Sequence, residues 1–289
     1  MSSAADNSEF KTIRVVKLHL TLGAEITGVD FLEPIPDEIF QEVLAVVAKT
    51  GLDDRGHVEF SRKFGELDDI KPYVTKYRKL RYDYYELFDA GNVDEKGNFL
   101  DPESLRAMYN KGNCLFHNPR RASYSILRAV VLPPPEAGGN TDFADSRTAF
   151  ADLLEDLRRE LVEKDYVVAH SLHHSRKTAA PDYFKHLNPT AFKMHKHRLV
   201  ELHEPFGRIS VYMGAHAHHI DGLSPDNTAE LLKRLMEHAT QEKYIISVTW
   251  KDPGDMVMWD NTAAMHRAGV FTGKHPRDLR RTTVHDASS

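Results

Sequence analysis

Histidine is the residue type that most suggests chemistry in this chain. Seventeen of the 289 residues are histidines, and a neutral imidazole is the commonest metal ligand in proteins. Several of these residues lie in stretches rich in lysine and arginine and are interpreted as surface residues: His173, His174, His186, His195 and His197. The stronger candidates for metal binding lie at residues 216–219 and at residue 266.

The segment Gly214–His219 contains three histidines in close succession. Alternate residues of a strand share one face, so His216 and His218 could bind one metal ion together. His218 and His219 also come just before Asp221-Gly222, a turn signal that favours a structural or pocket-lining role. A metal-dependent hydrolase built on these histidines is therefore a minor hypothesis.

His266 has a better position for chemistry. It follows a turn and a short apolar run over residues 254–261, so we expect it just beyond a buried strand, at the mouth of a barrel. Three arginines come next. If residues 277–284 form a strand, Arg277 and Arg281 share one face and Arg280 takes the other. Two arginines on one face can each bind a carboxylate in bidentate fashion. The alternative interpretation of residues 277–284 is a solvated basic strand at the edge of a sheet.

The elements that must position these residues are mainly strands. Alternation and short apolar runs predict strands over residues 11–16, 25–31, 125–132, 208–213, 244–250, 256–259 and 281–284. Helical spacing predicts helices over residues 36–48 (ended by Gly51), 56–64, 146–164 and 224–238. Residues 84–113 are expected to be a long, partly irregular excursion. Together these elements predict a mainly β fold with helical insertions, a β-sandwich or jelly roll.

Length and composition limit the possible domain organisation, partners and cellular location of the protein. We expect a disordered N-terminus over residues 1–10 and a single domain over residues 11–289. A net charge of −5 disfavours nucleic acid as a partner. The single cysteine, Cys114, excludes an internal disulfide and suits a reducing compartment. Because no run approaches the roughly 20 apolar residues that cross a bilayer, we expect a cytoplasmic protein with no membrane partner.

Several segments together resemble a known family. Residues 254–261, followed by His266-Arg267 and then by residues 277–281, are similar to the C-terminal signature of the taurine / 2,4-dichlorophenoxyacetate dioxygenases. Further landmarks of this family match in the same order at residues 60–65, 138–145 and 214–216. The resemblance runs from about residue 11 to the end. It is greatest for the 2,4-dichlorophenoxyacetate dioxygenase branch.

The resemblance implies a fold, a cofactor and a reaction. The fold is a double-stranded β-helix (jelly roll) that binds iron(II) through two histidines and one carboxylate, with open positions for 2-oxoglutarate and molecular oxygen. His117 resembles the first iron ligand and His266 the last. Arg277 and Thr141 match the residues that bind 2-oxoglutarate, and Arg281 matches the position that binds the acidic group of the substrate. The implied reaction hydroxylates a small acidic organic molecule while 2-oxoglutarate is decarboxylated to succinate. Relatives are often dimers or larger, so a homo-oligomer is also expected.

The sequence departs from the family pattern in two places. The family motif is His-x-Asp, but His117 runs into Asn118-Pro119, and no carboxylate occurs between Cys114 and Val131. A short gap after His117 that removes the aspartate explains this most simply. A second gap, near Gly51, removes an expected apolar strand. The alternative prediction is therefore a catalytically impaired family member, a pseudoenzyme or truncated isoform. A halogenase, a class that lacks the same carboxylate, is a minor alternative.

Overall fold

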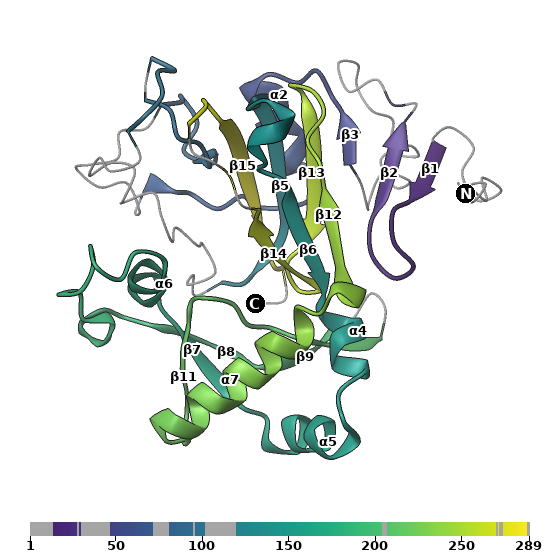
Figure 1. Cartoon of the computed structure of the whole chain (residues 1–289). Coiled ribbons are helices and arrows are strands. Elements are labelled where there is room, and N and C mark those ends of the chain that lie inside the picture. Colours follow the sequence, from purple (N-terminus) through teal and green to yellow (C-terminus); the bar gives the residue numbers. More distant parts are fainter. Residues whose placement is uncertain are drawn as a thin grey trace.

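The computed structural model describes residues 14–27, 29, 47–71, 81–94, 96–101, 120–203, 207–269, 271 and 274–287. Two facing sheets form its upper part (Figure 1). The larger sheet has the strand order β1 (Arg14–Lys17), β2 (Ala24–Thr27), β3 (Val47–Lys49), β13 (Asp255–Asp260), β5 (Ala122–Val131), β15 (Asp278–His285) and β4 (Phe88–Asp89). The smaller sheet has the order β12 (Ile245–Val248), β6 (Thr141–Asp145) and β14 (Ala264–Ala268). Apart from the β2–β3 pair, which is parallel, these strands pair antiparallel.

The strand period of two divides the side chains of the larger sheet between two cores. Leu127 of β5 and Val257 of β13 point between the sheets and pack with Phe143 of the smaller sheet. Their neighbours Ile126 and Met256 lie on the opposite face, in a cluster that contains Phe60 of helix α2 (Asp54–Arg62). The space between the sheets is therefore lined by alternate residues of β5 and β13.

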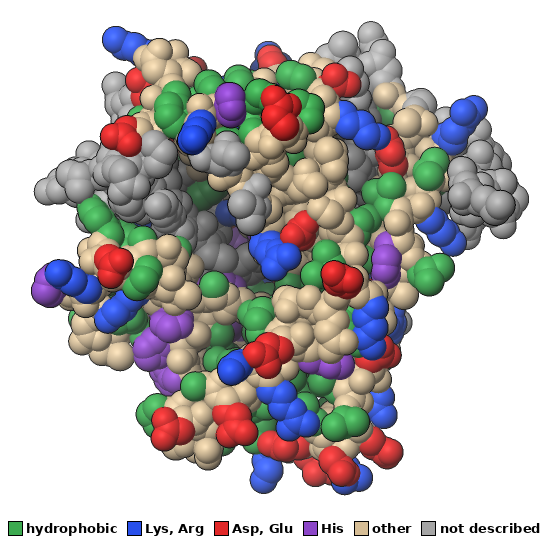
Figure 2. Space-filling model, viewed as in Figure 1, with side chains coloured by type: hydrophobic (Ala, Val, Ile, Leu, Met, Phe, Trp, Pro, Cys, Tyr) green, Lys and Arg blue, Asp and Glu red, His purple; other side chains and the backbone are tan. Residues whose placement is uncertain are grey.

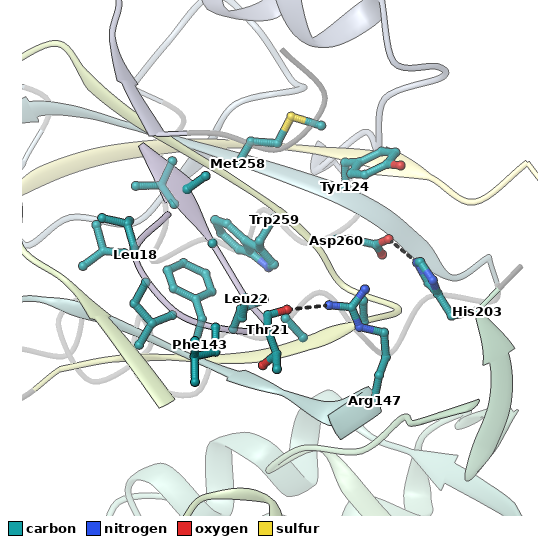
Figure 3. A pocket seen from close by; sticks show the side chains of 18 of the residues that line it. Leu18, Thr21, Leu22, Tyr124, Phe143, Arg147, His203, Met258, Trp259 and Asp260 are labelled. Carbon is teal, nitrogen blue, oxygen red and sulfur yellow. Dashed lines mark hydrogen bonds and ion pairs between the residues drawn. The ribbon is translucent and has the colours of Figure 1, made fainter. Parts of the chain in front are cut away.

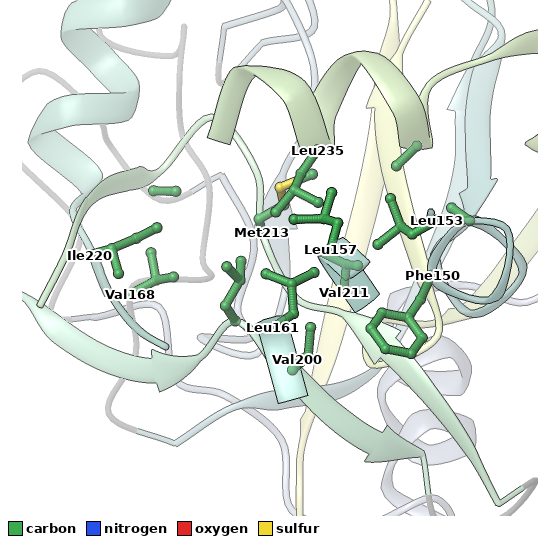
Figure 4. Packing of buried hydrophobic residues seen from close by; sticks show 14 of the residues in the cluster. Phe150, Leu153, Leu157, Leu161, Val168, Val200, Val211, Met213, Ile220 and Leu235 are labelled. Carbon is green, nitrogen blue, oxygen red and sulfur yellow. The ribbon is translucent and has the colours of Figure 1, made fainter. Parts of the chain in front are cut away.

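The lower part of the molecule is a helical insertion built around two small sheets. One sheet contains β7 (Val167–His170), β8 (His195–Arg198) and β11 (Ala217–Ile220), and the other contains β9 (Val200–His203) and β10 (Arg208–Val211). Its helices are α4 (Ser146–Ala151), α5 (Glu155–Lys164), α6 (Leu172–Ala179) and α7 (Pro225–Ala239). Short 3-10 turns are η2 (Pro135–Ala137), η3 (Pro189–Ala191) and η5 (Glu242–Tyr244). Figure 4 shows the buried cluster that joins these elements, including Phe150, Leu157, Leu161, Val168 and Leu235.

The predicted jelly-roll class with helical insertions is confirmed, and the predicted helix over residues 36–48 is wrong at its end. Val47–Lys49 forms β3, which pairs antiparallel with Asp255–Val257 of β13. Residues 36–46 lie outside the described part. The strand that is expected from the sequence to be missing near Gly51 is therefore present as β3. Its pairing with β13 and β2 outweighs the local helical pattern.

Three further predictions differ from the structure. The helix predicted over residues 146–164 is two helices, α4 and α5, separated at Asp152–Leu154. His218 and His219 belong to strand β11 and do not lie in a turn. Strands β6 and β14 were not predicted as strands. The predicted N-terminal disorder over residues 1–10 lies outside the described residues, and a single domain over residues 11–289 remains a prediction.

The described residues contain no helix that is both long and apolar enough to cross a membrane. On the face shown in Figure 2, lysine and arginine side chains are interspersed with aspartate and glutamate. This mixture agrees with the small net charge of the sequence.

Candidate active site

His266 lies between the two sheets on β14, where it pairs in register with Phe143 of β6. Its ring centroid is 4.6 Å from that of Trp259 and 6.4 Å from that of Phe143. Burial and the nearby charge of Arg281 lower the pKa of His266 to about 3. The imidazole is therefore neutral at physiological pH, which is the protonation state that a metal ligand requires.

Arg281 lies near His266 on strand β15. Its guanidinium carbon is 4.7 Å from the ring centroid of Phe88, the residue that pairs with it from β4. The preceding arginine, Arg280, binds Asp54 of α2 and Asp278, 2.9 Å away, on the other side of the sheet. Arg280 and Arg281 therefore take opposite faces, and only Arg281 accompanies His266.

Arg277 lies just before β15, with its guanidinium against main-chain oxygens. Its Nη2 donates to the carbonyl of Gly139 at 3.1 Å, and its Nη1 donates to the carbonyl of Ala90 at 3.4 Å. The Nε atom is buried and has no hydrogen-bond partner among the described residues. Burial lowers the pKa of Arg277 to about 10. No carboxylate within the described ranges forms an ion pair with it, so an anionic ligand would satisfy this group.

Thr141 begins β6, two residues after the glycine that contacts Arg277. Only 3% of Thr141 is exposed, and its hydroxyl oxygen accepts a hydrogen bond from Nε1 of Trp250 at 3.2 Å. Gly139 has a φ of +96°, and a Cβ there would lie 3.3 Å from Nε of Arg277. A glycine at this position therefore allows the guanidinium to approach the main chain beside Thr141.

The predicted first ligand, His117, lies outside the described residues. Within the described part of the chain, no group of three or more His, Cys, Asp or Glu side chains is arranged to hold a metal ion. The structure brings together the hydroxyl of Thr141 on β6, the neutral His266 on β14, Arg281 on β15 and Arg277 just before β15. This set fits a metal ligand beside a binding place for a dicarboxylate.

Comparisons with known proteins agree with this arrangement. The family model described as "Taurine catabolism dioxygenase TauD, TfdA family" matches residues 14–283. The chain belongs to this dioxygenase family. An alpha-ketoglutarate-dependent 2,4-dichlorophenoxyacetate dioxygenase of Burkholderia sp. (strain RASC) is 34% identical, over 86% of this chain and 84% of the relative. A protein of the same description from Cupriavidus pinatubonensis is 32% identical, over 93% and 96% respectively.

A solved structure described as AAD-2 in complex with Mn(II) and N-oxalylglycine matches with a TM-score of 0.84 and 32% identity, covering 96% of this chain and 99% of that one. The predicted family, fold and enzyme class are thereby confirmed. In that neighbour, Mn(II) and N-oxalylglycine stand in place of iron(II) and 2-oxoglutarate, the cofactor and co-substrate predicted from the sequence. The roles of the individual residues remain predictions.

The polar end of the motif at residues 254–261 stabilises the fold around His266. Asn261 accepts a hydrogen bond from Nε1 of Trp259 at 2.8 Å and donates to the hydroxyl of Ser125 at 2.9 Å. Asp260 lies 2.8 Å from Nε2 of His203. Trp250 and Trp259, which contact two predicted site residues, were not identified from the sequence, although Trp259 belongs to a motif segment that was quoted for the resemblance.

The histidines at residues 216–219 do not support the hydrolase hypothesis. Nδ1 of His216 lies 2.6 Å from Nδ1 of His170, and Nδ1 of His218 lies 2.8 Å from Nδ1 of His219. Each contact engages the Nδ1 atoms of two rings in a hydrogen bond with each other. Neither pair belongs to a larger metal-binding group within the described residues.

Proposed function

We propose that this chain is an iron(II)- and 2-oxoglutarate-dependent dioxygenase that hydroxylates a small acidic organic substrate. The observation that carries the proposal is Arg277, a buried guanidinium with an unsatisfied Nε and no carboxylate partner among the described residues. Such a group costs stability unless a ligand supplies the opposite charge. Family membership supports 2-oxoglutarate as that ligand.

Each predicted site residue receives a role in this proposal. Arg277 and Thr141 bind the distal carboxylate of 2-oxoglutarate, the arginine through two donors and the threonine through its hydroxyl proton. His266 and His117 hold iron(II). When bound, the metal supplies oxygen activation coupled to decarboxylation of 2-oxoglutarate to succinate and carbon dioxide. The chain's own residues orient the reactants and exclude water.

Arg281 defines the substrate class. Its guanidinium lies over Phe88 and close to His266, so an acidic substrate held there presents its body beside the metal position. Relatives are named for 2,4-dichlorophenoxyacetate and for (S)-phenoxypropionate, which are aryloxy carboxylates. We therefore propose a small carboxylate with an apolar body as the substrate.

A catalytically impaired member of the family is the second candidate. The observation that favours it is the sequence after His117, where Asn118 and Pro119 stand and no carboxylate follows before Val131. Two histidines alone hold iron(II) more weakly, because even the loss of an outer hydrogen-bond partner of a ligand costs about 10–100-fold in affinity or activity. This candidate keeps the 2-oxoglutarate site and loses turnover.

Succinate formation separates the two candidates. The purified chain is incubated with iron(II), 2-oxoglutarate and air, with and without a panel of aryl and alkyl carboxylic acids, and His266→Ala serves as the control. Substrate-stimulated succinate that is lost in the control supports the dioxygenase. If the folded chain forms none, a variant with a His-x-Asp segment inserted after His117 is assayed, and recovery of succinate supports the impaired member.

A cytoplasmic location without nucleic-acid or membrane partners accompanies this proposal, and the single cysteine supports a reducing compartment. Assembly into a homo-oligomer also remains a prediction, which light scattering on the purified chain would test.

A further inference from the structure

A cavity of about 660 Å³ lies between the β1–β2 hairpin and the seam where the two sheets meet (Figure 3). Its lining comes from residues 18–24 of the hairpin, from β12 and from β13. Strand β3 covers residues 255–257 of β13. The following residues of β13, 258–260, border the cavity. The predicted site residues His266, Arg277 and Arg281 do not line it. Phe143 and Trp259, whose rings lie beside His266, do line it, so the cavity adjoins the proposed metal position without containing its ligand.

One end of the cavity is apolar. Figure 3 shows Leu18, Leu22, Phe143 and Trp259 around the same space. Leu20, at the mouth of the cavity, is a large apolar side chain that is 97% exposed to solvent. The volume and apolar lining match those of small-molecule sites, which are about 300–1,000 Å³ with a few polar groups.

The other end is lined by two arginines, Arg147 and Arg208, and by one carboxylate, Asp260. Arg147 is paired with Asp145 at 3.1 Å, and Asp260 lies 2.8 Å from His203. Arg208 donates to the hydroxyl of Thr148 at 3.0 Å. Within the described ranges, Arg208 forms no ion pair with a carboxylate. This end of the cavity therefore has one guanidinium whose charge a ligand can neutralise.

We propose that this cavity binds a small-molecule monoanion with an extended apolar body, such as a medium-chain carboxylate. The carboxylate contacts Arg208, and the body lies along Trp259 and Leu22. Both halves of the cavity are needed, because the apolar wall supplies burial and the arginine selects the anion over a neutral molecule of the same shape. The inference does not depend on the proposed dioxygenase activity.

Tryptophan fluorescence of the full chain tests this inference with decanoate as the probe. The chain has two tryptophans, and only Trp259 lines the cavity. In the Trp250→Phe variant, Trp259 is therefore the sole reporter. We expect one saturable fluorescence change with decanoate, and binding of decanol that is weaker by at least about tenfold.

Two variants locate the site, each with a matched control. Arg208→Gln removes the charge, and Leu18→Glu places a negative charge at the partly exposed mouth; each should weaken decanoate binding by about tenfold or more. Arg198→Gln and Leu154→Glu change exposed residues of the same types away from the cavity and should leave binding unchanged. Thermal unfolding of each variant shows whether it is folded. Leu18 is 40% exposed, so Leu18→Glu keeps the test valid should Arg208→Gln not fold.

Three results would overturn the proposal. One is the absence of saturable decanoate binding by the folded chain. Another is equal affinity for decanoate and decanol, which would remove the role of Arg208. The last is loss of decanoate binding in Arg281→Gln with retention in both Arg208→Gln and Leu18→Glu, which would place the ligand beside His266.

Discussion

Trp250 donates the hydrogen of its indole nitrogen to the hydroxyl oxygen of Thr141 across 3.2 Å. This bond occupies an acceptor position of the hydroxyl and leaves its single proton free to be donated to a ligand carboxylate. Trp250→Phe should therefore raise the Kd for 2-oxoglutarate, measured calorimetrically with Mn(II), by about 3–10-fold. In a Thr141→Val background the same change should have almost no effect. An equal effect in both backgrounds would show that Trp250 acts in another way.

Arg277 is expected to dominate binding of 2-oxoglutarate. Arg277→Gln removes the buried charge, and we expect the KM for 2-oxoglutarate to rise about 100-fold, because truncating one partner of a buried charge pair costs about 2–5 kcal/mol. Arg277→Lys keeps the charge but loses the planar donors, so it should recover only part of this loss. Arg198→Gln, an exposed change, is the control. An unchanged KM in Arg277→Gln would contradict the assigned role.

Substitutions of the adjacent residues Arg280 and Arg281 on β15 should affect different properties, protein stability and substrate binding respectively. Arg281→Gln should raise the KM for an acidic substrate by more than Arg280→Gln does, because only Arg281 lies on the face of β15 near His266. Arg280→Gln should lower the free energy of unfolding by about 1–3 kcal/mol, because Asp54 and Asp278 each lose one of two arginine partners. Urea unfolding measures the stability of both variants, and steady-state kinetics measures their KM for the acidic substrate. The reverse pattern would mean that the two faces of the strand have been assigned wrongly.

Stability should fall in mild acid. Burial lowers the pKa of His57, His170 and His266 to about 3, whereas the unfolded residues titrate near about 6.5. Between these values the unfolded chain binds more protons, so the free energy of unfolding rises with pH. The contribution is complete above about pH 6.5 and is lost toward pH 3, by up to about 1.4 kcal/mol per pH unit for each histidine.

Urea unfolding at about pH 7.5 and about pH 5.5 tests this dependence. His57→Asn should reduce the pH dependence by the share of one histidine, with the unmodified chain at the same two pH values as the comparison. A free energy of unfolding that does not change between these two pH values would contradict the prediction.

The fold could be predicted where local pattern and tertiary environment agree. Helices α2 and α7 and strands β5 and β13 carry clear apolar periodicity, and each was expected within a few residues of its observed bounds. Strand β14 has the sequence Ala-Met-His-Arg-Ala, which contains no β-branched residue and is too short to show a period. Strand β3 reads as part of a helix because its pairing with β13 comes from a segment about 200 residues away in sequence.

The roles of the site residues could be predicted only through resemblance. The pattern singled out His266, Arg277 and Arg281, and the family signature added Thr141 and a role for each. The structure places Thr141 and His266 on paired strands of the smaller sheet, Arg281 on β15 of the larger sheet and Arg277 just before β15. The contacts that support them have no local signal, since Trp250 and Thr141 are 109 residues apart. That no carboxylate among the described residues forms an ion pair with Arg277 is likewise a property of the folded chain. For Arg277 the sequence offered its spacing from His266 and an expected face shared with Arg281.

The most direct test of the central claim is an anaerobic titration of the full chain with iron(II) and 2-oxoglutarate, followed by visible absorption. Chelation of the metal by the oxoacid gives a weak metal-to-ligand charge-transfer band. We predict that this band appears with the unmodified chain and is lost in His266→Ala and in Arg277→Gln at the same ligand concentration. A folded chain that gives no band at saturating iron(II) and 2-oxoglutarate would contradict the proposed cofactor site.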